Sequence, residues 1–250
     1  MIILRYMTKI AVIGGGFFGS CISFKLKEKN PNFQIDLFER CNDLLKGTSG
    51  KNQFRCHRGY HYPRSKKTYL ECQKSYLSFK KIFKNSFVES DNYYAISKNN
   101  SKTTFNEYIN FLEDVNLEYQ ITDNPLIKDE MVEGVVKVPE YIINIDKVRN
   151  ELKKQIEKFN INLYLNHEIA LDKDFQNKYD LIILATYENN NLLKNNLGIK
   201  TEKYFYQLVE KIIIKRPKIF DRFSCVVIDG DFLSIDPYAQ NCHVIGHVKK

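Results

Sequence analysis

The sequence lacks several features that would settle its class at once. Its six cysteines contain no C-x-x-C pair, so their spacing predicts neither a zinc site nor a redox-active dithiol. No apolar run approaches the ~18 residues of a membrane span, and the N-terminal MIILRY is too short for a signal peptide. There is no internal repeat and no low-complexity linker. The 250 residues still suffice to bury a substantial core, in one compound domain or in two small ones.

The positive charge is spread along the chain rather than concentrated. The net charge of +8 comes mostly from lysines scattered among asparagines, which a compositional bias explains more simply than a nucleic-acid surface. Several cysteines lie within apolar patterns, as is typical of reduced, buried thiols in a cytoplasm. We therefore expect a cytoplasmic protein that binds a small-molecule substrate but no nucleic acid and no membrane. Its oligomeric state stays open.

The most informative segment is KIAVIGGGFFGS, near the N-terminus. Residues 9–13 indicate a strand that is too apolar to expose either face to solvent. The glycines that follow, Gly14, Gly16 and Gly19, have the G-x-G-x-x-G spacing. In this motif the glycines permit a tight turn, close approach of the backbone to a pyrophosphate, and close packing of helix on strand. The phosphates would lie at the N-terminus of the next helix, where free N–H groups and the helix dipole favour negative charge.

A second expected strand, residues 34–38, ends in Glu39. This acid follows the last glycine by about 20 residues, the distance at which a carboxylate accepts hydrogen bonds from the ribose hydroxyls of an adenosine. The glycine triplet, the strand before it, the helix after it and the acid Glu39 together predict an adenine dinucleotide site in a parallel α/β domain.

The rest of the pattern predicts a second sheet. After Glu39 comes a polar segment, GTSGKNQFRCHRGYHYPRS, which is longer than a usual βα connection and is therefore suspected of being functional. Apolar spacing predicts helices over residues 69–83, 104–115 and 145–159, the second opened by a capping box of Thr104 and Glu107. Strands are expected over 92–97, 161–165 and 181–186, the last fully buried. Antiparallel strands are expected over 206–215, 224–229, 232–235 and 243–248, with a hairpin turn at Asp229-Gly230.

Taken together, these motifs resemble the FAD-dependent oxidoreductases of the D-amino-acid oxidase and glycine oxidase superfamily. The resemblance rests on GGGFFG with Glu39-Arg40, on TSGKNQFRCHRGYHYPRS, and on the later VPEYIINIDKVRNEL, DLIILAT and FLSIDPYA. It implies an α/β fold with a discontinuous Rossmann-like FAD-binding domain over 1–64 and 141–200. It also implies a second, mixed or antiparallel-sheet substrate domain over 65–140 and 201–250. Members of the superfamily continue through another glycine-bearing strand and helix that completes the flavin site, so we expect a C-terminally truncated chain.

The resemblance also implies roles for particular residues. The glycines would face the FAD pyrophosphate, Glu39 the adenosine ribose and Arg40 the adenine, while Thr48 and Ser49 would bond phosphate or ribityl oxygens. Tyr187 replaces the glycine of the family's A-T-G turn. The full set of implied cofactor-binding residues is Gly14, Gly16, Phe17, Phe18, Gly19, Glu39, Arg40, Thr48, Ser49, Asn52, Gln53, Ile169, Ala185 and Thr186.

The GYHYPRS run supplies the candidates on the substrate side. Arginine can clamp a carboxylate, tyrosines can wall a ring, and histidine can relay a proton near neutral pH. The candidate catalytic residues are Tyr60, His61, Tyr62 and Arg64, with Arg58 beside them. The alternative is that the tyrosines pack in the core while His61 and Arg64 satisfy loop carbonyls. His243 and His247 have a zinc-helix spacing, but the residues between them favour a strand.

The predicted function is that of an FAD-dependent oxidoreductase. It would oxidise an amine or hydroxyl carbon of a small, polar, amino-acid-like molecule, with hydride transfer to flavin N5. Two alternatives stay open: an NAD-dependent dehydrogenase, which the long loop over 47–64 disfavours, and a truncated, non-catalytic remnant of a flavoprotein. RNA binding through the basic aromatic loop is a more distant possibility, and loss of affinity with rising salt would be its signature.

Overall fold

A computed structural model describes residues 8–206, 208–230, 232–238 and 241–248. The N-terminal MIILRY lies outside these residues. The chain divides into two compact units, Met1–Asn52 with Asp146–Gln207 and Gln53–Ile145 with Leu208–Lys250, here called unit 1 and unit 2. Each unit therefore contains two segments of the chain, and the crossings lie at 52/53, 145/146 and 207/208. The predicted domain boundaries stay a prediction, because these units are defined by contacts and not by independent folding.

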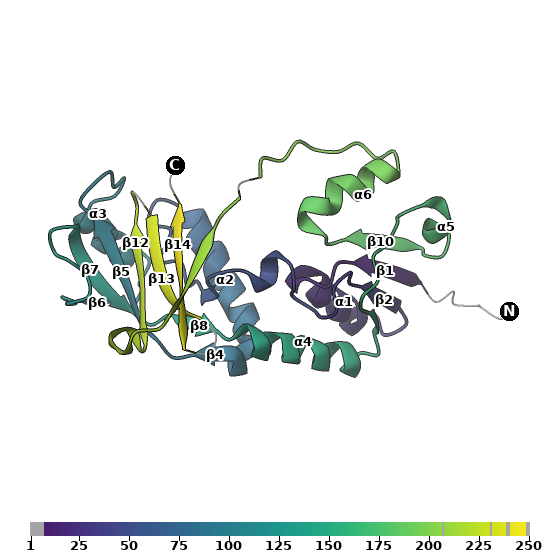
Figure 1. The fold of residues 1–250 in the computed structure, drawn as a ribbon, viewed down its shortest axis with the longest axis horizontal. Helices are drawn as coiled ribbons and strands as arrows, with labels where there is room; N and C mark the ends of the chain where they lie inside the picture. The colour runs from purple at the N-terminus through teal and green to yellow at the C-terminus, as the bar shows by residue number, and fades with distance from the viewer. Residues whose placement is uncertain (1–7, 207, 231, 239–240, 249–250) are drawn as a thin grey trace. The chain divides into compact units, whose positions relative to one another are not determined.

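Unit 1 contains a parallel sheet with the strand order β10-β1-β2-β9 (Figure 1). Its strands are β1 (Lys9–Ile13), β2 (Gln34–Phe38), β9 (Asn162–Tyr164) and β10 (Leu181–Leu184). Its helices are α1 (Phe17–Lys29), α4 (Ile145–Lys158), α5 (Lys173–Gln176) and α6 (Asn190–Asn196), with short 3-10 turns η1 (Thr48–Gly50) and η3 (Tyr187–Asn189). The parallel α/β architecture expected for the nucleotide domain is confirmed.

The position of β1 inside this sheet explains why its sequence is apolar. Residues 10–13 of β1 are all buried, because strands flank β1 on both sides and side chains cover both faces. The expectation that residues 181–186 form a fully buried strand is wrong: β10 lies at the edge of the described sheet and Leu181 is 47% exposed. An apolar run alone does not distinguish a central strand from an edge strand.

Unit 2 is built on a mixed sheet with the order β11-β14-β13-β12-β5-β7-β6 among the described residues. Only the β12–β5 pair is parallel; the other neighbours in this order are antiparallel. Its strands are β5 (Asp91–Ser97), β6 (Gln120–Ile121), β7 (Val132–Val138), β11 (Lys211–Lys215), β12 (Phe223–Ile228), β13 (Phe232–Tyr238) and β14 (Cys242–Val248). A smaller antiparallel sheet has the order β3-β8-β4, from Arg55–Cys56, Tyr141–Ile143 and Phe87–Val88.

Most of the elements expected in unit 2 are present. The predicted antiparallel β12–β13 hairpin is confirmed, and His243 and His247 lie on strand β14 as expected. The strand expected over 206–215 is shorter, since β11 begins at Lys211 and residue 207 lies outside the described positions. The remaining elements are α2 (Lys66–Phe83), α3 (Phe105–Asp114) and the 3-10 turns η2 (Lys84–Ser86) and η4 (Lys218–Phe220).

Helix α3 begins where its sequence predicts. Thr104 Oγ1 accepts a hydrogen bond from Glu107 N–H at 3.2 Å, and Glu107 Oε2 accepts one from Thr104 N–H at 2.8 Å, so the capping box is formed. Tyr108 and Leu112 of this helix pack in one buried cluster with Tyr94 and Val226 of the sheet. Within the described residues, no helix is long and apolar enough to span a membrane.

Candidate functional site

The turn between β1 and α1 has a geometry that two of its glycines impose. Gly14 has φ +110°, and a Cβ placed on it would lie 2.5 Å from the carbonyl oxygen of Ala185. A Cβ on Gly19 would lie 1.9 Å from the carbonyl oxygen of Gly14. Both positions therefore require glycine for the fold itself: one for a left-handed backbone, the other for close contact of helix with strand.

Gly16 is different, because neither its backbone nor its neighbours require glycine. It is the N-cap residue of α1, with φ −68° and ψ −178°, a conformation open to any residue. A Cβ there would have a single neighbour within 4 Å, Ser49 Oγ at 3.4 Å. The vacant position therefore faces open space at the N-terminus of α1, as close approach of an anion to the backbone requires.

The surroundings of this helix N-terminus suit a phosphate group. The first turn of α1 contains no acidic residue, and Gly16 supplies no capping side chain. The hydroxyl of Ser49, from η1, lies beside it and accepts a hydrogen bond from the Phe17 N–H at 3.1 Å. Because a hydroxyl both accepts and donates, Ser49 can bond an anion at the same place.

Glu39 lies at the glycine turn, as its distance along the chain predicts. One carboxylate oxygen accepts a hydrogen bond from Gly15 N–H at 2.7 Å, and the other accepts one from Cys41 N–H at 2.8 Å. The side chain is largely buried. Each oxygen keeps a second lone pair, so the carboxylate can still accept bonds from a diol placed beside the turn.

The turn after β10 lies beside the glycine turn, at the carboxyl end of β1. Ala185 N–H donates to the carbonyl of Ile13 at 2.8 Å, and the hydroxyl of Thr186 donates to Asn190 Oδ1 at 2.8 Å. Tyr187 has φ +54°, so it adopts the left-handed conformation that glycine normally supplies. Tyr187 thus takes a backbone conformation that glycine would adopt without strain. The cofactor-binding roles of Ala185 and Thr186 stay predictions.

Other predicted cofactor residues of unit 1 lie in varied surroundings. Phe18 is 81% exposed, and the guanidinium of Arg40 is half-exposed, with Nη2 3.9 Å from Glu188 Oε1. Ile169 is buried in the cluster that contains Phe38. Thr48 and Asn52 lie on the surface near Ser49.

The GYHYPRS run and Gln53 belong to unit 2. Tyr60 is completely buried, and its hydroxyl donates to the carbonyl of Glu118 at 2.6 Å, so it is a core residue. Arg64 forms a two-bond ion pair with Asp229, whose carboxylate also accepts a hydrogen bond from the Thr103 hydroxyl at 2.8 Å. Tyr60 thus packs as the alternative expects, whereas Arg64 bonds a carboxylate rather than loop carbonyls. Their catalytic roles stay predictions.

His61 lies in an aromatic cluster. Its ring centroid is 5.6 Å from that of His57, and the rings of Tyr62 and Phe232 lie 5.1 Å from it. Burial lowers the pKa of His61 to about 3, and burial also lowers the pKa of His57. Both imidazoles are therefore neutral near pH 7, so the structure gives no support to a proton relay through His61 near neutral pH. Burial raises the pKa of the Tyr62 hydroxyl.

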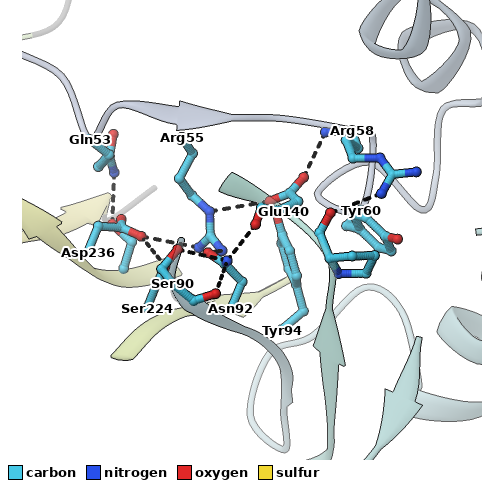
Figure 2. A network of polar contacts seen from close by, with 12 residues as sticks. Gln53, Arg55, Arg58, Tyr60, Ser90, Asn92, Tyr94, Glu140, Ser224 and Asp236 are labelled. Carbon is cyan, nitrogen blue, oxygen red and sulfur yellow. Dashed lines mark hydrogen bonds and ion pairs between the residues drawn. The ribbon is translucent and has the colours of Figure 1, made fainter. Parts of the chain in front are cut away.

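A buried polar network anchors the start of this loop (Figure 2). At its centre is Arg55, whose Nε lies 3.4 Å from Glu140 Oε2 and whose Nη1 donates to Asp236 Oδ1 at 3.2 Å. Its Nη2 donates to Asn92 Oδ1 at 3.1 Å. The side chains of Arg55, Glu140 and Asp236 are almost fully buried. Burial lowers the pKa of the Arg55 guanidinium, but Tyr94 and the two carboxylates outweigh it, so the pKa is raised.

Glu140 connects this buried network to the backbone of the loop that contains GYHYPRS. Its Oε1 accepts a hydrogen bond from the Arg58 N–H at 2.7 Å, and its Oε2 accepts one from the Tyr94 hydroxyl at 2.9 Å. The side chain of Gln73 bonds the Arg58 carbonyl at 2.6 Å. Arg58, the residue that precedes GYHYPRS, is thus held through both its backbone N–H and its backbone carbonyl. Sequence reasoning missed Glu140 and Asp236. For Asp236 the available signal was its charge inside the strand pattern FLSIDPY.

Comparison with known proteins gives curated relatives named as FAD-dependent monooxygenases and as a dehydrogenase. No family model matches the chain. The FAD-dependent monooxygenase FPY4 of Fusarium mangiferae is 30% identical over 141 residues, which cover 56% of this chain and 38% of that protein. An L-2-hydroxyglutarate dehydrogenase of Indibacter alkaliphilus is 33% identical over 54 residues, covering 22% of this chain and 14% of that protein. The matched region is therefore well under half the length of either curated relative.

Solved structures match nearly the whole chain. Glycine oxidase from Geobacillus kaustophilus superposes with a TM-score of 0.71 at 14% identity, over 97% of this chain and 72% of that one. The chain has the glycine oxidase fold. L-proline dehydrogenase from P. horikoshii gives 0.68 at 14% identity, over 97% and 70%, and the amino acid oxidase NikD gives 0.63 at 12% identity, over 96% and 70%. The resemblance stated from the sequence is confirmed at the level of the fold.

Within this fold, the first unit suits an adenine dinucleotide. Gly16 leaves open the space at the N-terminus of α1, Ser49 stands beside it, and Glu39 lies at the turn. These residues come from three separate parts of the unit, after β1, after β2 and in η1. The geometry therefore fits the group that the glycine motif predicts. The individual assignments of cofactor and catalytic residues stay predictions.

Proposed function

We propose that the chain forms the dinucleotide-binding part and the adjoining sheet of an FAD-dependent oxidoreductase. It would oxidise an amine or hydroxyl carbon of a small, polar, amino-acid-like substrate. The observation that carries the proposal is the unfilled Cβ position of Gly16 at the N-terminus of α1, with Glu39 at the same turn. The names of the relatives support the cofactor and the class of reaction, since they include FAD-dependent monooxygenases and a glycine oxidase.

The residues of unit 1 would hold the cofactor. The N-terminal amides of α1 and the hydroxyl of Ser49 would bind the pyrophosphate, because they are hydrogen-bond donors that lie at the open position beside Gly16. Glu39 would bond the ribose hydroxyls, and Arg40 would lie beside the adenine. When bound, the isoalloxazine supplies the acceptor for a hydride equivalent at N5, so this chain needs no side-chain nucleophile.

The residues of unit 2 would contribute to the substrate side. His61 and Tyr62 are the candidates that are neither core residues nor engaged in an ion pair. A neutral histidine orients a polar substrate by hydrogen bonding rather than by exchanging protons at pH 7. Tyr60 and Arg64 would instead hold the loop that carries His61 and Tyr62 in place, through their contacts with Glu118 and Asp229. Activity, substrate and partners of the whole protein are part of this proposal, because the chain matches only a fraction of its curated relatives.

The proposal is tested by the spectrum and the FAD affinity of the purified protein. We expect flavin absorbance near ~450 nm, or quenching of FAD fluorescence on titration. Gly16→Val places methyl groups at the open position and should abolish FAD binding without unfolding the protein. Gly47→Val is the matched control, because a Cβ at Gly47 has no neighbour within 4 Å.

Three outcomes would count against the proposal. FAD affinity that is unchanged in Gly16→Val places the cofactor elsewhere. Stabilisation by NAD, with no response to FAD, indicates the dehydrogenase alternative. No response to either nucleotide indicates a flavoprotein remnant that has lost its cofactor.

A further inference from the structure

Helix α2 of unit 2 carries lysine and leucine side chains along one exposed line (Figure 1). Six exposed positions follow one another at alternating spacings of three and four residues, so they share one face of the helix. They are Lys67, Leu70, Lys74, Leu77, Lys81 and the C-cap residue Lys84, here called the α2 stripe.

The opposite face of α2 fixes the direction of the stripe. Tyr76 and Phe83 are buried, and the ring of Tyr76 stacks on Phe87 with the centroids 6.1 Å apart. The hydroxyl of Tyr69 donates to the carbonyl of Val115 at 3.1 Å. These aromatic residues lie on the far side of the helix from the stripe, roughly half a turn away. The stripe therefore faces outward from the core of unit 2.

The two leucines form the apolar centre of this face. Leu70 is 56% exposed and Leu77 is 64% exposed, and they lie about two turns apart on the same line. The aliphatic stems of the neighbouring lysines extend the apolar surface, while their ammonium groups can reach outward into a polar layer. Leucine side chains in such a position gain free energy when an apolar medium replaces water around them.

The charge of the helix is of one sign. Its one acidic residue, Glu71, lies outside the stripe. The lysines of the helix and its C-cap are Lys66, Lys67, Lys74, Lys80, Lys81 and Lys84. Among the described residues, none of these lysines is in an ion pair. A basic face with leucines at its centre is complementary to a surface that is negatively charged outside and apolar beneath.

We propose that the α2 stripe binds the surface of a lipid bilayer that contains anionic lipids. The helix would lie along the bilayer, with Leu70 and Leu77 at the boundary between headgroups and acyl chains and the lysines among the anionic headgroups. A nucleic acid would engage the lysines but would leave the leucines in water, so a bilayer fits both parts of the stripe.

The expectation that the chain binds no membrane rests on the lack of an apolar run long enough to span one. A helix that lies in the interface needs no such run, because only one of its faces enters the apolar layer. The stripe belongs to one helix of unit 2, so this binding does not require FAD.

The test is co-sedimentation of the full chain with lipid vesicles. Vesicles of equal parts phosphatidylserine and phosphatidylcholine should bind the protein at least about tenfold more tightly than vesicles of phosphatidylcholine alone. Binding should weaken as sodium chloride is added, because salt screens the attraction between lysines and headgroups.

A first variant removes charge from the stripe by combining Lys67→Gln, Lys74→Gln and Lys81→Gln. Each lysine near an anionic surface strengthens binding about fivefold, so the triple variant should bind roughly a hundredfold more weakly. The matched control removes the same charge from exposed positions of unit 2 outside α2, and combines Lys128→Gln, Lys215→Gln and Lys218→Gln. The control should bind more than tenfold better than the stripe variant, if α2 and not the net charge is responsible.

A second variant, Leu70→Ala with Leu77→Ala, keeps the charge and removes the apolar centre. Alanine favours the helix, so α2 should be retained, while binding to the phosphatidylserine vesicles should weaken by about tenfold or more. The control is Leu192→Ala with Ile219→Ala, since these side chains are 60% and 67% exposed and lie outside α2. Circular dichroism checks that each variant is folded.

Several results would overturn the proposal. These are no binding to phosphatidylserine vesicles, unchanged binding in either folded stripe variant, and an equal loss in its control. Tighter binding to duplex RNA than to the vesicles, insensitive to the leucine substitutions, would assign the stripe to a nucleic acid instead. FAD titration of the same samples is a separate readout: vesicle binding without FAD binding leaves this proposal standing and counts against the proposed function, and the reverse result does the opposite.

Discussion

Removal of the Glu140 side chain should destabilise unit 2 more than any surface change in it. The carboxylate is completely buried and has three partners: Arg58 N–H at 2.7 Å, the Tyr94 hydroxyl at 2.9 Å and Arg55 Nε at 3.4 Å. Glu140→Ala leaves a buried guanidinium with one carboxylate instead of two, and leaves two donors without an acceptor. Breaking a buried ion pair from one side costs about 3–5 kcal/mol, so we expect a loss of that size in the free energy of unfolding.

The assay is urea unfolding followed by circular dichroism, with Glu89→Ala as the control. Glu89 forms an ion pair of 3.3 Å with Arg222, but its side chain is 81% exposed. Exposed pairs contribute about 0–1 kcal/mol, so the control should be nearly neutral. The two variants thus remove the same chemical group from a buried and an exposed ion pair of one unit.

A double-mutant cycle refines the interpretation. Arg55→Met and Glu140→Gln each leave a buried polar group without its partner, and together they remove both halves of the pair. The double variant should therefore be less destabilised than the sum of the two, by roughly 0.5–3 kcal/mol. A cost below about 1 kcal/mol for Glu140→Ala, with additive effects in the cycle, would refute the reasoning that the network is a coupled unit.

Two further predictions follow from individual residues. The pKa of His61 is lowered from 6.5 to about 3, so the unfolded chain binds a proton that the folded chain rejects, and the stability of the protein should fall as the pH drops through that window. His61→Phe should flatten this part of the stability–pH curve, and an unchanged slope would contradict the assignment. Tyr187 has φ +54° and is 61% exposed, so Tyr187→Asn should raise the free energy of unfolding by roughly 1 kcal/mol; a loss of stability in urea unfolding would count against strain at this turn.

The nucleotide turn could be predicted because its determinants are local. Gly14, Gly16 and Gly19 lie within six residues of one another: a Cβ on Gly14 or Gly19 would collide with backbone atoms, and Gly16 leaves the N-terminus of α1 open. The capping box of Thr104 and Glu107 is similarly contained in four residues. Where the physical cause lies in neighbouring residues, the pattern of the sequence is sufficient to identify it.

The buried network could not be predicted, because its partners are far apart in the chain. Arg55 and Asp236 are separated by 181 positions, and Asn92 and Glu140 by 48. Apolar periodicity indicates that a position is buried but not which residue lies opposite. The same limitation explains β10, whose apolar sequence gives no sign that Leu181 lies at an edge of the described sheet.

The order of segments in the two units has a consequence for synthesis of the protein. Strands β5 and β12 pair directly, yet all of the second segment of unit 1 lies between them in the chain. A ribosome therefore completes unit 1 before it makes the strand that β5 needs, and before Arg55 can meet Asp236. During that interval β5 has an unpaired edge and Arg55 lacks one of its two counter-ions, so this part of the nascent chain is exposed to aggregation.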